Sequence, residues 1–304
     1  MTSKRFLRTF AWWTLGLIGV VISINVYIDI YGLFLGRGGR KVYTNERTSK
    51  FLLSFRYIPE NYDGFIIGPS LSDNLNPASL HGYTIYNASI MGANISDLHH
   101  LVNNMVERGN MKVAIICLDP YLTKDFGPKA ATINEKEYYG ALGSLNLLKT
   151  YMMYVIRTNQ LMPAKFTRVM SDENGWTDFE FERGKVDAQA AIAKKVELKQ
   201  HEETYIDDRA FNELQEVVEQ LRARNIKVVA YFSPVPRPIY DIGKEDYREF
   251  ETRIGSIFNE DDVLFNLNDD VYSPITSDYK MYIDHGHLSA AGQAFVLREI
   301  NSRL

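Results

Sequence analysis

Short apolar runs alternate with stretches of helical periodicity through most of this chain. Residues 112–118 (KVAIICL) are apolar almost throughout, which is typical of a parallel strand buried on both faces. Similar runs predict further strands at 64–68, 84–89, 227–232 and 263–266. Apolar residues recur at helical spacing around 95–108, 211–221 and 289–302. This alternation predicts an α/β fold in which helices cover both faces of a mainly parallel sheet, three layers in all.

Near its start the chain has a long stretch without charge. The nineteen residues from Phe10 to Ile28 would span about 28 Å as a helix, close to the hydrocarbon thickness of a bilayer. Trp12 and Trp13 near one end and Tyr27 near the other are placed as interfacial aromatic residues are. A cleaved signal peptide would need a shorter apolar core followed by a small-residue site, and a buried core helix rarely runs this long without charge. We therefore predict one transmembrane helix that anchors the chain.

The orientation of this anchor depends on its flanks. Basic residues stand on both sides, so the positive-inside rule is nearly balanced: Lys4, Arg5 and Arg8 before the stretch, and Arg37, Arg40 and Lys41 after it. The very short N-terminal tail favours a tail that stays inside and a C-terminal part that is exported. We expect a single-pass protein of the cell membrane with an extracytoplasmic C-terminal domain. Ser23 and Asn25 are either tolerated polar residues or hydrogen-bond to a partner helix.

Three parts, the last with an insert, follow from these patterns. Residues 1–35 form the tail and anchor, and the polar, basic, glycine-rich residues 36–62 are interpreted as a linker. The α/β domain occupies 63–304, with an insert at about 122–205 that does not fit the alternation. That insert holds a patch rich in Tyr, Met and Leu at 138–162. It is either a helical subdomain that caps the sheet edge or a lid that faces the membrane or covers the substrate.

Composition narrows the chemistry. The net charge of −4 gives no basic footprint for nucleic acid, so we expect no nucleic-acid partner. The single cysteine, Cys117, excludes an internal disulfide, a CxxC redox motif and a cysteine-rich zinc site, and its place in an apolar strand indicates a core residue. We expect neither a metal nor a cofactor. The chain has six histidines, and only two pairs of them lie close in sequence, His99 with His100 and His285 with His287.

Two short motifs carry candidate chemistry. The strand at 64–68 ends in Gly68-Pro69-Ser70, where a glycine permits a sharp turn and a helix start supplies backbone N–H groups beside a serine. This pattern is weak alone, because Ser70 or Ser72 could equally cap the next helix. Carboxyl ends of parallel strands are nevertheless where α/β folds place ligands.

The second motif stands more than two hundred residues later. Asp284 and His287, three apart before the last helix, can project to one side of a turn, so that the carboxylate holds the imidazole tautomer and the other ring nitrogen takes a proton from a serine. Two alternatives are a solvated turn in which Ser289 caps the helix, and a metal half-site. No further His/Cys ligand cluster in the sequence supports the metal site.

Together, the order of these motifs resembles the SGNH/GDSL hydrolase-like superfamily. It looks most like a membrane-anchored branch that includes the D-alanine-transfer protein and alginate O-acetyltransferase-like proteins. The phrases that carry the resemblance run from the anchor to the last helix: Asp29-Ile30-Tyr31-Gly32, Gly68-Pro69-Ser70 with Pro77 downstream, Tyr86-Asn87 through Gly92, Leu118-Asp119-Pro120, and Asp284 with His287. Residues 122–205 match only vaguely.

The resemblance implies roles for these residues. Ser70 would be the nucleophile, His287 the general base and Asp284 its orienting partner. The backbone N–H groups of Ser70 and Gly92 would form the oxyanion hole, where losing one donor costs roughly 3 kcal/mol. This chain departs from the pattern, because Pro69 replaces the family's aspartate and the third block with its asparagine donor is absent. Asn87 or Asn94 could substitute; otherwise they are turn-forming and helix-capping residues.

Two more residues are candidates for substrate contact. Arg237 follows a strand end in a proline-rich loop, where it could meet an anionic substrate group, although the loop could equally be only a rigid connection. His285 lies between Asp284 and His287 and either touches substrate or lines the turn.

Related acyltransferases also lack the third block, which favours acyl transfer over simple hydrolysis. The leading hypothesis is therefore a membrane-anchored serine O-acyltransferase or esterase that modifies a cell-envelope or secreted polysaccharide through an acyl-serine intermediate. The resemblance also implies an acyl donor, supplied through a membrane-bound O-acyltransferase. The rival is a non-catalytic SGNH-fold subunit for polysaccharide binding or for assembly with a membrane partner.

Overall fold

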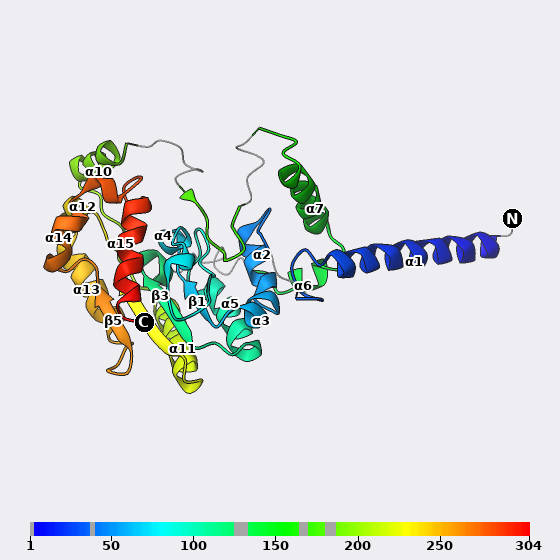
Figure 1. The fold of residues 1–304 in the computed structure, drawn as a ribbon, viewed down its shortest axis with the longest axis horizontal. Coiled ribbons are helices and arrows are strands. Elements are labelled where there is room, and N and C mark those ends of the chain that lie inside the picture. Colours follow the sequence, from blue (N-terminus) through cyan, green and yellow to red (C-terminus); the bar gives the residue numbers. More distant parts are fainter. Residues whose placement is uncertain (1–2, 37–39, 125–132, 164–169, 180–186) are drawn as a thin grey trace.

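A computed structural model describes residues 3–36, 40–124, 133–163, 170–179 and 187–304 (Figure 1). Its described residues contain one sheet of five parallel strands in the order β2-β1-β3-β4-β5. The strands are β1 (Gly64–Ile67), β2 (Ile85–Asn87), β3 (Val113–Leu118), β4 (Lys227–Phe232) and β5 (Val263–Asn266). The predicted α/β class with a mainly parallel sheet is confirmed, and every predicted strand forms. The chain reverses its direction of winding between β1 and β3, which is where such sheets bind ligands.

Helices cover both faces of this sheet, because successive side chains of a strand point to opposite sides. On β3, Ala114 and Ile116 belong to one core cluster while Val113 and Ile115 belong to the other. The first cluster packs under α2 (Glu46–Leu53), α5 (Ile95–Arg108), α11 (Asp208–Ala223) and α13 (Lys244–Gly255). The second packs under α10 (Ala188–Glu197), α12 (Arg237–Ile242) and α15 (Ala290–Asn301). The arrangement is the predicted three-layer one.

The interpretation of residues 36–62 as a linker is wrong. This segment contains α2 and α3 (Tyr57–Asn61), and residues of both are buried in the main core. Val42 also pairs with Ser171 in an isolated antiparallel bridge. The two helices have eight and five residues, too short for a clear periodic pattern, and one of their buried residues is a lysine. Residues 40–62 are therefore part of the α/β domain.

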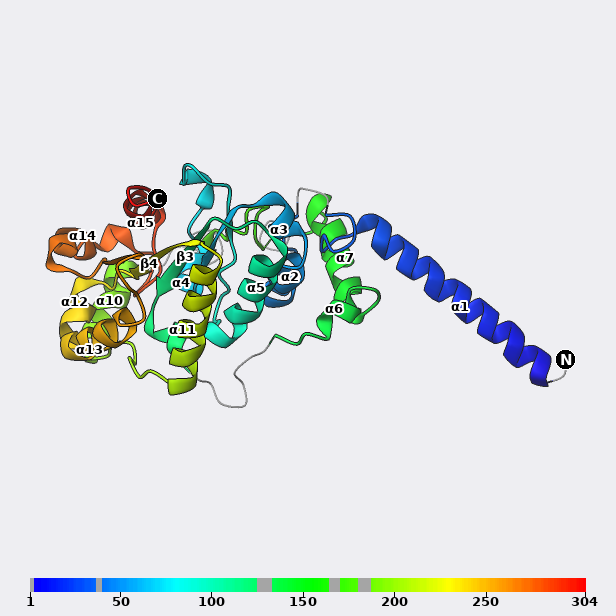
Figure 2. The ribbon, with the colours of Figure 1, turned by 90° about the horizontal axis from the view of Figure 1, so that it is seen from below.

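The N-terminal helix α1 (Ser3–Ile28) leaves the domain as an extended rod (Figures 1 and 2). Among the described residues it is the helix long and apolar enough to cross a membrane, a test that signal sequences pass as well. Its last turn is tied to the domain, because the Asn25 side chain is buried and donates to the backbone carbonyl of Leu142. Just beyond, the Asp29 carboxylate accepts three backbone N–H groups, those of residues 33, 34 and 35.

Parts of the predicted insert at 122–205, residues 125–132, 164–169 and 180–186, lie outside the described residues. The described parts form α6 (Glu137–Gly140), α7 (Leu145–Thr158) and α10. Helix α10 packs on the sheet through Ile192, whereas α6 and α7 lie at the end of the domain where α1 leaves it (Figure 2). The insert thus contributes to two opposite ends of the molecule.

Removing the Phe51 ring tests whether α2 belongs to the core. The side chain is buried and its ring lies 5.1 Å from that of Phe55. We expect Phe51→Ala to lower the free energy of unfolding by about 3–5 kcal/mol, as for other buried aromatic side chains. Tyr205→Ala, at an exposed aromatic residue, is the control and should cost less than about 0.5 kcal/mol. Urea unfolding of the full chain in detergent measures both, and equal losses would contradict the placement of α2 in the core.

Candidate active site

Ser70 lies at the carboxyl edge of the sheet, directly after β1. The strand ends at Ile67, and the chain turns through Gly68 and Pro69 into α4 (Ser70–Asp73). The turn is tight because a Cβ on Gly68 would lie 2.3 Å from the Ser72 Oγ and 2.6 Å from the Cys117 Cβ. Glycine is therefore required here, and it brings the start of α4 close against β3.

Asp284 and His287 lie on a closed loop before α15. Tyr282 and Leu288 pair across the base of this loop, and the Ile283 N–H donates to the His287 carbonyl at 2.8 Å. The Asp284 Oδ1 accepts the backbone N–H groups of Gly286 at 2.9 Å and His287 at 2.8 Å. The carboxylate thus fixes the backbone of the loop as well as the imidazole beside it.

The fold brings the three predicted side chains into one hydrogen-bonded array. The Ser70 Oγ lies 2.9 Å from the His287 Nε2, and the His287 Nδ1 lies 2.9 Å from the Asp284 Oδ2. With Nδ1 protonated and donating to the carboxylate, Nε2 can accept the serine proton. The Phe179 ring meets the imidazole edge-on at 5.4 Å and restricts its rotation. This geometry is what a serine nucleophile with a general base requires.

The electrostatics of Asp284 suit this arrangement. Burial acts to raise the pKa of Asp284, but the His287 imidazole and the N–H groups of Gly286 and His287 outweigh burial and hold the pKa well below its usual range. The carboxylate is therefore ionised at neutral pH and can stabilise an imidazolium. For His285, burial lowers the pKa, which favours the neutral ring.

A cavity of about 250 Å³ opens beside Ser70 and His287. His285 lines it, together with apolar side chains that include Val235 and Ile239, and a contact of His285 with substrate stays a prediction. Its polar wall comes partly from the insert and was not predicted: Tyr121, Lys195, Gln200, His201 and Glu202. Tyr121 directly follows the Leu118-Asp119-Pro120 phrase after β3. The other four residues follow no motif in the sequence, and they reach the cavity through the packing of α10 and the residues after it.

Asp119 also lines this cavity. It stands at the end of β3, and its Oδ1 accepts the Tyr121 N–H at 2.9 Å. Burial raises the pKa of Asp119 to about 6, so this carboxyl titrates near neutral pH. Asp119 is named from the sequence only within the Leu118-Asp119-Pro120 phrase, and no role at the site is predicted for it.

Backbone amides remain candidates for the oxyanion hole. The first N–H groups of a helix have no partner within it, and the Ser70 N–H at the start of α4 has no acceptor among the described residues. The Gly92 N–H likewise has none among them, and Gly92 holds a φ of 67°, which favours glycine. The role of both amides in an oxyanion hole stays a prediction.

The substitute asparagine donors are corrected by the structure. The Asn87 side chain is fully buried, and its Nδ2 donates to the carbonyls of residues 72, 73 and 75. Its Oδ1 accepts the Ser89 N–H at 3.0 Å. The Asn94 Oδ1 caps α5, and its Nδ2 donates to the Lys124 carbonyl. The Asn87 amide is therefore saturated by backbone groups and is not free to bind an oxyanion. In Asn94, the Oδ1 and one N–H of the amide are likewise bound to the backbone.

Arg237 is also placed differently from the prediction. Its guanidinium contacts two carboxylates, with Nε 2.8 Å from Asp241 and Nη1 2.8 Å from Asp270. These ion pairs lie outside the residues that line the cavity. Arg237 therefore holds the start of α12 in place rather than presenting a free cation to a substrate. Within the described residues there is no group of three or more His, Cys, Asp or Glu side chains placed to hold a metal ion.

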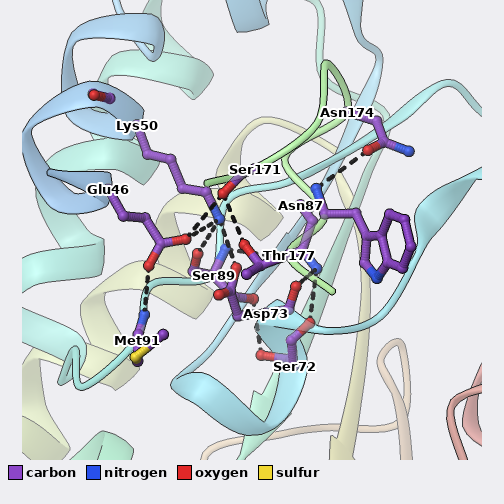
Figure 3. A network of polar contacts seen from close by, with 12 residues as sticks. Glu46, Lys50, Ser72, Asp73, Asn87, Ser89, Met91, Ser171, Asn174 and Thr177 are labelled. Atoms are coloured by element: carbon purple, nitrogen blue, oxygen red, sulfur yellow. Dashed lines mark hydrogen bonds and ion pairs between the residues drawn. The ribbon is translucent and has the colours of Figure 1, made fainter. Parts of the chain in front are cut away.

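Sequence reasoning missed a buried ionic cluster beneath α4, which we call the Lys50 cluster: Glu46, Lys50 and Asp73. Figure 3 shows Lys50 reaching from α2 to Asp73 on α4. The Lys50 Nζ lies 2.7 Å from the Asp73 Oδ1 and 2.9 Å from the Glu46 Oε1, and it also donates to the Ser89 carbonyl. All three side chains are buried. A sequence signal exists only as Glu46 and Lys50 four residues apart, which is common on exposed helix faces.

One cation faces two carboxyl groups in the Lys50 cluster. Burial lowers the pKa of Lys50, but Asp73 and Glu46 outweigh burial and leave it above the ordinary value. Burial also acts to raise the pKa of Glu46, yet Lys50 and the Met91 N–H bring it below the ordinary value. For Asp73, burial and then the Glu46 charge hold the pKa well above its usual range. These shifts favour an ion pair between Lys50 and Glu46 and the protonated form of Asp73.

No family model matches the chain, and no curated protein matches it either. Among solved structures, a Streptococcus pneumonia protein described as a platelet activating factor is 11% identical, with a TM-score of 0.45 over 85% of this chain and 90% of that one. The acetyl xylan esterase AlAXEase is 12% identical, with a TM-score of 0.43 over 79% of this chain and 99% of that one. Both TM-scores lie below 0.5, too low to assign an activity to this chain.

The assignment of charge within the Lys50 cluster can be tested by substitution. Lys50→Met leaves the Glu46 carboxylate buried without a cation, and we expect the free energy of unfolding to fall by about 3–5 kcal/mol. Asp73→Asn replaces a neutral acid by a neutral amide of the same shape, so it should lower the free energy of unfolding clearly less than Lys50→Met does. Urea unfolding of the full chain at pH 7 compares the two. A larger loss for Asp73→Asn than for Lys50→Met would contradict a protonated Asp73.

Asp119 predicts a pH-dependent stability. Its folded pKa of about 6 lies above its ordinary value of 3.8, so the folded chain binds this proton more tightly than the unfolded chain does. Stability from this group is therefore complete below about pH 4 and is lost as the pH rises through 6. Asp119→Asn keeps the acceptor for Tyr121 and removes this loss. In urea unfolding, we expect the free energy of unfolding of the variant to be about 1–3 kcal/mol higher than that of the native chain at pH 8. At pH 4 the two should be equal. An equal gain at both pH values would point to packing instead.

Proposed function

We propose that this chain is a membrane-anchored serine O-acyltransferase or esterase of the SGNH type, acting on a cell-envelope or secreted polysaccharide. The observation that carries the proposal is the array Ser70–His287–Asp284, with 2.9 Å between the serine Oγ and the imidazole Nε2, beside a cavity. A solvated turn or a helix cap would not align three polar side chains from opposite ends of the chain. Ser289, the capping residue of the alternative interpretation, does cap α15, but it does so beside the array and without displacing it.

The proposed reaction has two halves. The Ser70 Oγ attacks the carbonyl carbon of an acyl donor while the His287 Nε2 takes the hydroxyl proton, and the amides of Ser70 and Gly92 receive the oxyanion. The tetrahedral intermediate collapses, the leaving group takes the proton from His287, and an ester remains on Ser70. A sugar hydroxyl, or water in an esterase, then loses its proton to His287 and attacks the carbonyl carbon of this ester. The bond from this carbon to the Ser70 Oγ breaks, the acyl group stays on the acceptor oxygen, and the serine oxygen takes the proton back from His287. Asp284 stays ionised throughout and stabilises the imidazolium.

The cavity supports a short acyl group. Its volume of about 250 Å³ is below the roughly 300–1,000 Å³ typical of sites for drug-sized ligands. Val235 and Ile239 offer an apolar wall for an acyl chain, and the neutral His285 ring and the insert residues offer hydrogen bonds for hydroxyl groups. The acyl donor, with a membrane-bound O-acyltransferase as its source, and the glycan acceptor are parts of this proposal.

The anchor is supported by how α1 joins the domain. A signal peptide that is cleaved needs an accessible junction, whereas Asp29 and Tyr31 just after α1 are buried, and Asn25 is hydrogen-bonded to the insert. We therefore propose that α1 stays attached and holds the domain on the extracytoplasmic side.

Labelling with a fluorophosphonate tests the catalytic proposal. The full chain in detergent should label at Ser70, and Ser70→Ala should abolish labelling, because the nucleophile is gone. We expect His287→Ala to slow labelling by roughly 10²–10⁴-fold, which is the usual contribution of general-base catalysis, and Asp284→Asn to slow it by a smaller factor.

Ser72→Ala is the matched control two residues away. The Ser72 Oγ bonds to the Pro69 carbonyl and the Ser89 Oγ, away from His287, so this variant should label normally once folded. A folded native chain that does not label, or that labels equally without Ser70, would sink the enzyme proposal and favour the non-catalytic subunit.

A further inference from the structure

Helix α7 exposes an apolar stripe. Leu145, Leu148, Met152 and Val155 are 85%, 56%, 55% and 48% exposed. They stand at i, i+3, i+7 and i+10, so they share one face of the helix. The opposite side contributes Leu147 and Thr150 to the domain interior. An apolar face of this extent is unusual on a monomeric soluble protein and marks a surface that contacts something apolar.

The stripe continues into α1. Leu142, Gly143, Leu145 and Leu148 line one apolar groove together with Val21 and Ile22 of α1. The contact is close, since a Cβ on Gly143 would lie 3.8 Å from a Val21 methyl group. Figures 1 and 2 both show α7 beside the end of α1 at which the rod enters the domain. The α6–α7 turn is therefore held at a fixed height along the anchor.

That height can be estimated from helix geometry. Val21 precedes the end of α1 at Ile28 by seven residues, which is about 10 Å along the axis. If α1 spans the bilayer up to Ile28, the α6–α7 turn lies within its apolar zone. Amphipathic helices at a membrane surface bury their apolar faces by roughly 5–10 Å, which is the same depth.

The charges and aromatic residues of this region also fit a membrane surface. Residues 138–163 contain no Asp or Glu but include Lys149 and Arg157. Tyr138, Tyr139 and Tyr154 are exposed, and tyrosine is enriched where the apolar zone meets the headgroups. Basic side chains at that level attract anionic lipids.

We propose that the face formed by Tyr139, Leu142, Leu145, Leu148, Met152 and Val155 lies in the lipid interface of the bilayer that α1 spans. This inference rests on the anchor in the proposed function, but not on its chemistry. The face makes a second attachment beside α1 and sets the tilt of the domain. Helices α10 and α12, which line the cavity, lie at the opposite end of the molecule (Figure 2), so this attachment holds the cavity away from the bilayer, toward an acceptor in the envelope space.

Lipid quenching in liposomes tests the proposal. The full chain would carry single cysteines at Leu148 or Met152, labelled with an environment-sensitive fluorophore, in liposomes of phosphatidylcholine and phosphatidylglycerol with brominated acyl chains. Native Cys117 does not interfere, because it is buried and burial raises the pKa of its thiol to about 12. Ile18→Cys reports whether α1 is inserted, and Val271→Cys, which is 75% exposed, is the far-side control.

We expect brominated lipids to quench labels at 148, 152 and 18 several-fold and to leave the label at 271 unchanged. Quenching at 18 without quenching at 148 and 152 would overturn the interfacial face and keep the anchor, and the face would then await a protein partner. Absence of quenching at 18 would overturn the anchor and this inference together. Neither result depends on whether the fluorophosphonate labels Ser70, so the catalytic proposal is tested independently.

A charge variant sharpens the test. The double variant Leu148→Glu and Met152→Glu would carry its fluorophore on Val155→Cys. Lipid quenching of this label should be mostly lost, because moving two carboxylates into the lipid interface costs free energy. The exposed polar position Asn146→Glu is the matched control and should retain it. Equal quenching in both variants would contradict contact between this face and lipid.

Discussion

The Lys50 cluster is the interaction on which the site depends. Lys50 on α2 joins Glu46 to Asp73 on α4, and it also binds the Ser89 carbonyl in the loop after β2. Glu46 in turn accepts the Met91 N–H, next to Gly92. Both segments that carry the proposed oxyanion donors are therefore tied to one buried ammonium. A buried charge is costly without its partners, so these segments have little freedom to separate.

Parallel sheet topology supplies the second constraint. Ser70 follows β1, and Asp284 and His287 precede α15, yet the carboxyl edge of the sheet brings them within hydrogen-bonding distance across 217 residues of sequence. The closed loop at 282–288 holds the imidazole from one side, and the Gly68 turn holds the serine from the other. Each half is held by contacts within its own segment, and the sheet brings the two halves together.

The insert links this site to the other end of the molecule. Its α10 packs on the sheet and contributes Lys195 to the cavity, while its α6 and α7 lie against α1. In the proposed setting, one segment of the chain both shapes the substrate cavity and contacts the bilayer. Asp29 strengthens the junction, because three backbone N–H groups converge on its buried carboxylate just after α1 ends.

Patterns local in sequence were sufficient for the strands and for α1 as a helix, because strand burial and helix length depend on near neighbours. The Ser70, Asp284 and His287 motifs were weak singly and were predicted from their order along the chain, which resembles that of a known family. Tertiary structure alone decided the rest. Lys50 looks like an exposed helix residue until Asp73 and Ser89 surround it. Asn87 and Arg237 look available until backbone carbonyls and two aspartates saturate them. Whether a polar group is free depends on partners distant in sequence, which only the folded chain brings together.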